Sequence, residues 1–227
     1  MHLYAIRVPE MDAVFHLHPE LTAPGDFHIA LPSMPAGNYK LYGDIVHANG
    51  FPETMVSTIT VPPNMPGSSF GPDDANGSPQ PLSRGELGNS CKLPDGYVMV
   101  WDRPATISAN TAYAFRFHLL NPNGNPATDV QLYMGMAGHA AFVKTDGTVF
   151  AHTHPEGSAA MAALMLANGG NAGDHEDMSM DMRMHDNPLS NIVEFPYGFP
   201  SPGRYRIFIQ MKHSAIIETG AFDVTVP

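Results

Sequence analysis

The chain has little cysteine, few basic residues and no long apolar run. Its 227 residues include a single Cys, so no internal disulfide can stabilise the fold. Eleven Lys and Arg stand against 22 Asp and Glu, a net charge of −11. Such a surface repels nucleic acid and anionic lipid and attracts cations, which excludes nucleic-acid binding. No apolar run approaches the roughly 18 residues of a membrane span, so we expect no membrane span in this chain.

Breakers of regular structure are abundant instead, with 22 Pro and 21 Gly. Together with 43% hydrophobic residues, this composition disfavours a helical bundle and favours a packed core of short strands joined by turns. Met and His are also frequent, at 15 and 12 residues. Thioether and imidazole are ligands of transition metals, and of copper above all.

The sequence contains an internal repeat. Val14–Pro19 resembles Phe150–Pro155, each with a His-x-His-Pro motif, and Gly37–Tyr42 resembles Gly203–Phe208. Each copy carries four histidines at matching places, which are His2, His16, His18 and His47 in the first copy and His139, His152, His154 and His213 in the second. A repeat of this kind predicts two copies of one structural unit.

Turn signals and apolar alternation divide the chain into three parts. We predict a partial β-sandwich repeat at 1–61, a Pro/Gly-rich linker at 62–91, and an immunoglobulin-like β-sandwich at 92–227 with an insertion at 157–188. About eight short strands are predicted in the last part, a number typical of that all-β fold, and they span residues 97–101, 112–120, 130–134, 139–143, 148–154, 192–195, 204–212 and 220–226.

The first copy lacks sequence equivalent to the strands that precede His139. A sandwich without its first strands would leave edges and half of a core exposed. We therefore expect that the chain begins inside a domain, and that a longer precursor, a strand-donating partner chain or a homo-oligomer supplies the missing strands. The alternative is that 1–61 packs its open face on 92–227 as an atypical sheet.

The histidine spacing predicts metal sites. Residues two apart share one face of a strand, so His152 and His154 point the same way. A two-residue turn at Asp146-Gly147 places His139 opposite His154, whereas a four-residue loop places it opposite His152. His213 ends an apolar alternation, so we expect it at the same interior. This reasoning predicts one site formed by His139, His152 and His154, with His213 as fourth ligand or close neighbour, and an equivalent site formed by His2, His16, His18 and His47. The alternative is a set of hydrogen-bonded core histidines.

A Met-rich segment adds a second type of ligand. Within 174–186, four Met alternate with other residues and two His flank them, namely Met178, Met180, Met182, Met184, His175 and His185. Thioethers select Cu(I) over Zn(II), so we predict a Cu(I)-binding loop. The alternative is an acidic loop in which the methionines are incidental.

The sequence resembles bacterial exported β-sandwich proteins of the YtkA-like and FixH-like kind in three segments, 135–143, 150–155 and 202–205. Members of these families are often encoded with copper-handling functions. The resemblance implies an immunoglobulin-like fold, a periplasmic or extracellular location and a role with copper. The Met-rich insertion departs from that family pattern.

These features together predict an exported, non-enzymatic copper-binding protein for copper sequestration, transfer or resistance, with a copper-delivering or copper-receiving protein as partner. One alternative is a copper or zinc enzyme in which His139, His152 and His154 leave a position for water, with Glu156 or Glu218 as the nearest acid or base. The other is a structural or adhesive surface module with buried histidines.

Overall fold

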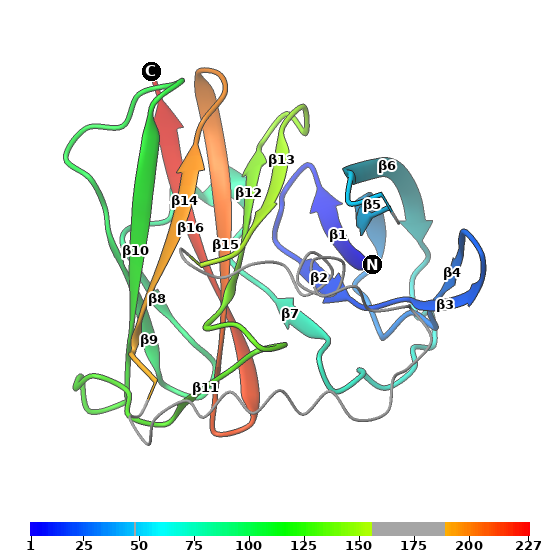
Figure 1. Cartoon of the computed structure of the whole chain (residues 1–227), viewed down its shortest axis with the longest axis horizontal. Helices are drawn as coiled ribbons and strands as arrows, with labels where there is room; N and C mark the ends of the chain where they lie inside the picture. The colour runs from blue at the N-terminus through cyan, green and yellow to red at the C-terminus, as the bar shows by residue number, and fades with distance from the viewer. Residues whose placement is uncertain (48, 156–188) are drawn as a thin grey trace.

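The structure is a computed structural model that describes residues 1–47, 49–155 and 189–227 (Figure 1). Over these residues the chain is all-β, and its one helical turn is the 3₁₀ turn η1 (Leu82–Arg84). No helix in this part of the chain has the length and apolar character needed to cross a membrane.

The C-terminal unit is a β-sandwich of two antiparallel sheets. The first has the order β14-β10-β9-β8, with bounds Ile192–Gly198, Ala112–Leu120, Val98–Asp102 and Ser90–Lys92. The second has the order β11-β15-β12-β13, and β16 pairs with β15 along its whole length. The bounds are Val130–Gln131, Gly203–His213, His139–Lys144, Phe150–Thr153 and Ile216–Val226. This arrangement of strands is that of an immunoglobulin-like sandwich, as the sequence predicts.

The N-terminal part forms a third sheet rather than a second sandwich. Its order is β6-β5-β1-β2-β7, with bounds Pro52–Val61, Gly37–Val46, His2–Val8, Val14–Leu17 and Ala75–Gly77. A separate hairpin joins β3 (Glu20–Ala23) to β4 (Asp26–His28). Residues 62–91 differ from the predicted extended linker, because they contribute β7 to this sheet and most of β8 to the sandwich. The sequence does not predict β7 and β8, because the segment 62–91 has no apolar periodicity.

The repeat is present in the structure. The strands β1, β2, β5 and β6 pair with one another as β12, β13, β15 and β16 do. Equivalent glycines open β5 and β15, and both have positive φ, 147° at Gly37 and 139° at Gly203. Equivalent tyrosines two residues later each donate a hydrogen bond to a carbonyl four residues upstream, Tyr39 to Pro35 and Tyr205 to Ser201, both at 2.8 Å. The two copies therefore share local geometry as well as sequence.

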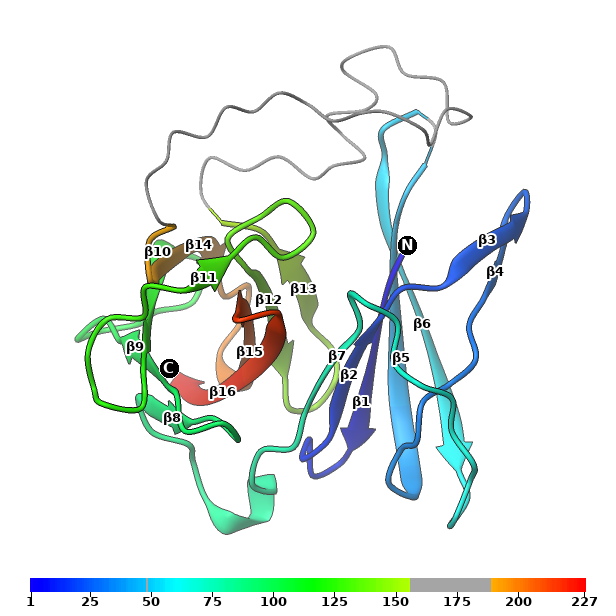
Figure 2. The same ribbon diagram turned by 90° about the horizontal axis from the view of Figure 1, so that it is seen from below.

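The three sheets stack face to face, with the sheet of β12 and β15 in the middle (Figure 2). One face of this central sheet packs on β9, β10 and β14 around Trp101, Phe115 and Phe117. Its other face packs on β1, β2 and β5, where Tyr4 and Tyr42 meet Phe208. A strand buried on both faces has apolar residues in both of its alternating sets, which is the pattern of β12 and β15.

The C-terminal unit thus covers the open face of β1, β2 and part of β5, the alternative that the sequence left open, whereas β6 stays largely exposed. The opposite face, around Phe15 and Tyr39, is covered by Met34, Ile29 and Met65 from the chain's own connecting segments. No strand from another chain is needed to bury either face of β1 and β2.

Candidate metal centre

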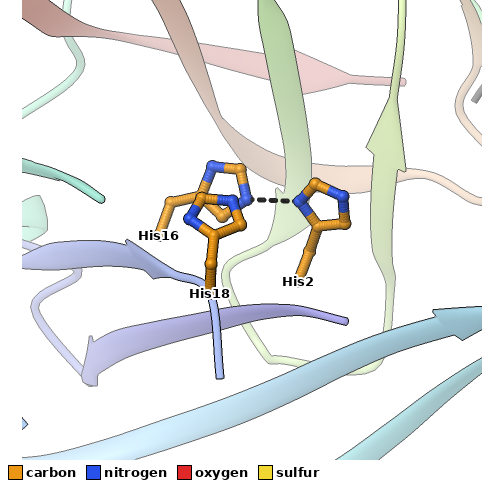
Figure 3. A group of neighbouring side chains, drawn as sticks. All are labelled: His2, His16 and His18. Carbon is orange, nitrogen blue, oxygen red and sulfur yellow. Dashed lines mark hydrogen bonds between the residues drawn. The ribbon is translucent and has the colours of Figure 1, made fainter. Parts of the chain in front are cut away.

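Six histidines, three from each copy of the repeat, meet where β1 and β2 face β12 and β13. They are His2, His16 and His18 (Figure 3) together with His139, His152 and His154. Their neighbouring ring centroids lie between 4.6 and 6.4 Å apart. Contacts cross between the copies as well as within them, with 4.7 Å between His2 and His152. We call this group the six-histidine cluster.

Strand register explains why these side chains converge. Ala141 lies opposite His152, so the register continues to His139 opposite His154; this confirms the two-residue turn at Asp146-Gly147. In the first copy Tyr4 lies opposite His16, which places His2 opposite His18 in the same way. Each copy therefore presents three imidazoles on one face, and the two faces pack against each other.

Hydrogen bonds orient the rings. His2 Nδ1 lies 2.9 Å from His16 Nε2, and His139 Nδ1 lies 3.0 Å from His152 Nε2. The second ring nitrogen of His16 and of His152 is hydrogen-bonded to a residue outside the cluster. Nδ1 of His16 lies 2.7 Å from Gln210 Oε1, and Nδ1 of His152 lies 2.9 Å from Asp44 Oδ2. A metal-binding histidine typically has its other nitrogen held in this manner.

Two neutral rings cannot satisfy all three polar contacts of His139 and His152, because these contacts need three N–H donors and two neutral imidazoles carry two. His152 Nδ1 donates to the Asp44 carboxylate, and His139 Nε2 donates at 3.3 Å to the carbonyl oxygen of Tyr133. A neutral imidazole carries one N–H, so the two nitrogens that face each other at 3.0 Å are then both lone pairs. Two lone pairs at that distance are repulsive unless a proton or a metal cation lies between or beside them.

Burial disfavours the proton. Desolvation, with smaller contributions from His152 and the other neighbouring imidazoles, lowers the pKa of His139 and His16 well below the ordinary range of imidazole. Desolvation likewise lowers the pKa of His154 to about 4. A metal cation could supply a positive charge here without protonating a ring, because it binds neutral imidazoles.

His18 connects the cluster to solvent. Its Nδ1 lies 3.2 Å from Asp74 Oδ1, while its Nε2 is buried and has no hydrogen-bond partner. A buried ring nitrogen without a partner is costly, and a bound cation would satisfy it. On its other side His18 lines a cleft of about 720 Å³ together with Glu20, His28 and Asp73. This cleft gives one end of the cluster an acidic approach.

Two of the predicted ligands, His47 and His213, do not join the cluster, so their predicted placement beside the other histidines is wrong. His47 follows β5 and pairs with Glu53 at an exposed position. His213 is buried on the opposite face of the central sheet, where it lies near Asp95. Residues 205, 207, 209, 211 and 213 face β9 and β10, whereas Phe208 and Gln210 face the cluster. Because both faces of β15 are apolar, its alternation pointed to the wrong interior.

Other predicted positions lie apart from the cluster or outside the described residues. Glu218, a suggested acid or base, lies beside His213, and burial followed by Asp95 raises its pKa to about 7. His118, a histidine of β10 outside the repeat, pairs with Asp102 on β9. Outside the described residues lie Met178, Met180, Met182, Met184, His175, His185 and Glu156.

Sequence reasoning missed the residues that orient the rings. Asp44 and Gln210 occupy equivalent places in the repeat, three residues before His47 and His213. Aligning the two copies for polar residues other than histidine would have found both. Asp74 and Tyr133 lie in connecting segments with no counterpart in the repeat, and only the packing of these segments brings them to His18 and His16.

Residues 92–227 match a family described as a domain of unknown function (DUF8832), and the chain belongs to that family. No curated protein matches the sequence, and no solved structure matches it. The matched residues contain one half of the six-histidine cluster, and residues 1–61 contribute the other half.

Proposed function

We propose that the chain is an exported copper-binding protein that holds copper in the six-histidine cluster between its two repeats. The observation that carries this proposal is the His139–His152 pair, whose three polar contacts two neutral rings cannot all satisfy and which lies where burial disfavours a proton. The export and the role in copper sequestration or transfer follow from the resemblance stated above and are part of the proposal.

The donor set favours copper among the available ions. Imidazole nitrogens suit copper and zinc, and Cu(II) forms the more stable complexes of the two. Two nitrogens bound at about 2.0–2.1 Å to one ion lie about 2.8–3.4 Å apart for bond angles between square-planar and tetrahedral values. The Nδ1–Nε2 distances of 2.9 and 3.0 Å in the two His pairs fall at the lower end of this range.

A binding role, rather than catalysis, fits the position of the cluster. His16 and His139 are 0% and 1% exposed, so the centre is closed by the two sheets. The cleft at His18 would let an ion in or out, and its lining by Glu20, Asp73 and Asp74 would attract cations. We therefore propose uptake and release through the cleft, with a copper-delivering or copper-receiving protein as the partner.

The test compares two histidines that line the same cleft. Metal-free full-length protein is titrated with Cu(II) and, separately, with Zn(II) in competition with a chelator. Loss of a second-shell group typically costs 10–100-fold in metal affinity, so His18→Ala, which removes a ligand, should weaken Cu(II) binding by at least about 100-fold. His28→Ala removes an exposed histidine outside the cluster and should leave the affinity unchanged.

Equal Cu(II) affinity in His18→Ala and wild type would contradict the proposal. Electron paramagnetic resonance of the Cu(II)-loaded protein should show coupling to several nitrogens. Tighter binding of Zn(II) than of Cu(II) would replace copper by zinc as the ion of this centre.

A further inference from the structure

A second group of potential ligands lies on the other face of the central sheet. His213 at the end of β15, Glu218 on β16 and Asp95 in the turn between β8 and β9 place one ligand atom each within 4.8 Å of one another. The group lies between the two sheets of the sandwich, and β15 separates it from the six-histidine cluster.

His213 is buried without a hydrogen bond. The residue is 1% exposed, and neither ring nitrogen has a hydrogen-bond partner. Its Nε2 lies 3.2 Å from Asp95 Oδ2, and its Nδ1 lies 3.6 Å from Asp129 Oδ2. The ring of Tyr97 stacks on the imidazole at 3.9 Å. A buried imidazole with two unsatisfied nitrogens is unfavourable unless a ligand completes its environment.

The first copy of the repeat offers a natural comparison. His47 and Glu53 are the equivalents of His213 and Glu218, and they form an exposed pair at 2.7 Å. Asp95 has no equivalent there, because it comes from the β8–β9 turn of the sheet that only the C-terminal unit possesses. In the C-terminal unit the His213–Glu218 pair is therefore buried and has Asp95 as a second carboxylate, whereas the His47–Glu53 pair of the first copy is exposed.

Asp129 is placed to orient His213 rather than to join the group. Its Oδ2 accepts a hydrogen bond from the hydroxyl of Tyr97 at 2.9 Å and another from Ser214. It faces the Nδ1 side of the ring, so it favours a proton on Nδ1 and a lone pair on Nε2 toward Asp95 and Glu218. This is the relation in which a carboxylate commonly holds a metal-binding histidine.

We propose that His213, Asp95 and Glu218 form a second divalent-cation site, independent of the six-histidine cluster, and that Zn(II) is the ion it fits best. One imidazole and two carboxylates form a nitrogen and oxygen donor set that Zn(II) accepts, with a fourth position left for water. The set contains no sulfur, so it offers nothing that selects Cu(I). A cation would also neutralise two adjacent carboxylates in a partly buried position.

Crystals of the full chain grown with Zn(II) test the proposal by anomalous difference density at the zinc edge. Wild type should show a peak bounded by His213, Asp95 and Glu218. In solution titration Asp95→Asn and Glu218→Gln should each bind one Zn(II) equivalent fewer than wild type. Asp95→Asn keeps the side-chain oxygen that accepts the hydrogen bond of the Tyr97 amide at 3.1 Å, so it should preserve the β8–β9 turn. It therefore provides the test if Glu218→Gln disturbs folding.

The matched control is Glu53→Gln, the same substitution at the equivalent exposed pair, and it should retain both the peak and the equivalent. Absence of the peak in wild type, or an unchanged Zn(II) stoichiometry in Asp95→Asn, would overturn the proposal. Neither readout depends on copper in the six-histidine cluster, so this site and the proposed function succeed or fail separately.

Discussion

Asp44 and Gln210 occupy equivalent positions of the repeat, and each accepts a hydrogen bond from a histidine of the opposite copy. Asp44 in the first copy holds His152 of the second, and Gln210 in the second copy holds His16 of the first. The amide nitrogen of Gln210 donates to Thr219 at 3.2 Å, which directs its oxygen toward His16. These two hydrogen bonds connect the two copies through histidine rings of the cluster. They differ in one respect, because the acceptor is a charged carboxylate at Asp44 and a neutral amide at Gln210.

The first prediction follows from that asymmetry. Asp44→Ala should lower Cu(II) affinity by about 10–100-fold, because it removes the carboxylate that fixes the proton on His152 Nδ1. Gln210→Ala should cost less, since a neutral amide makes the weaker hydrogen bond. Chelator competition measures both, with Asp26→Ala on the exposed β4 as control. Equal affinity in Asp44→Ala and wild type would show that the carboxylate does not support a metal ligand.

The second prediction distinguishes one shared centre from two separate sites. His16→Asn and His152→Asn each alter a different copy of the repeat, yet both should weaken the same copper equivalent. In the double variant the loss of binding free energy should be smaller than the sum of the two single losses, since residues at one site do not act independently. Equilibrium dialysis and chelator competition provide the measurements. If each single variant instead lost one of two equivalents and kept the other intact, the two copies would bind metal separately.

The third prediction concerns acid stability of the metal-free protein. Burial lowers the pKa of His16 and His139, so below about pH 6.5 the unfolded chain binds protons at these residues that the folded chain does not. The free energy of unfolding should therefore decrease as the pH falls below that value, by up to about 1.4 kcal/mol per pH unit for each histidine that stays neutral. Above about pH 7 these groups contribute no slope.

Urea unfolding of the metal-free protein across this pH range checks the prediction. Full occupancy by copper should keep this slope or make it steeper, because the metal-bound folded chain excludes protons from the ring nitrogens while the unfolded chain still binds them. A metal-free protein whose stability is constant between pH 7 and pH 5 would contradict the burial of neutral histidines.

The fourth prediction concerns the methionines of 174–186, which lie outside the described residues. Replacing Met178, Met180, Met182 and Met184 by Leu should weaken Cu(I) binding, because Leu keeps the apolar bulk but removes the thioethers. Zn(II) binding should be unchanged. Competition titrations with a Cu(I) chelator give the affinities, and identical values for wild type and the fourfold variant would show that the thioethers are not ligands.

Local sequence determined much of the secondary structure. It also determined which histidines of each copy share one face of their strands. The strand Ala112–Leu120 coincides with its predicted bounds, and the turn at Asp146-Gly147 sets the register that brings His139 and His154 together. These features depend on alternation and turn chemistry within a few residues, so they can be derived without tertiary structure. The repeat likewise identified His2, His16 and His18 as the counterparts of His139, His152 and His154.

Tertiary structure decided that the two groups form one cluster and that His213 belongs elsewhere. Alternation tells which residues share a face, but β15 is apolar on both faces, with Ile207 on one and Phe208 on the other, so it does not tell which face meets which partner. That choice depends on the sheet of residues 1–61 packing directly on the central sheet, a contact between segments more than a hundred residues apart. Asp74, Tyr133 and Asp95 come to their histidines through the same long-range packing, which leaves no periodic signal in the sequence.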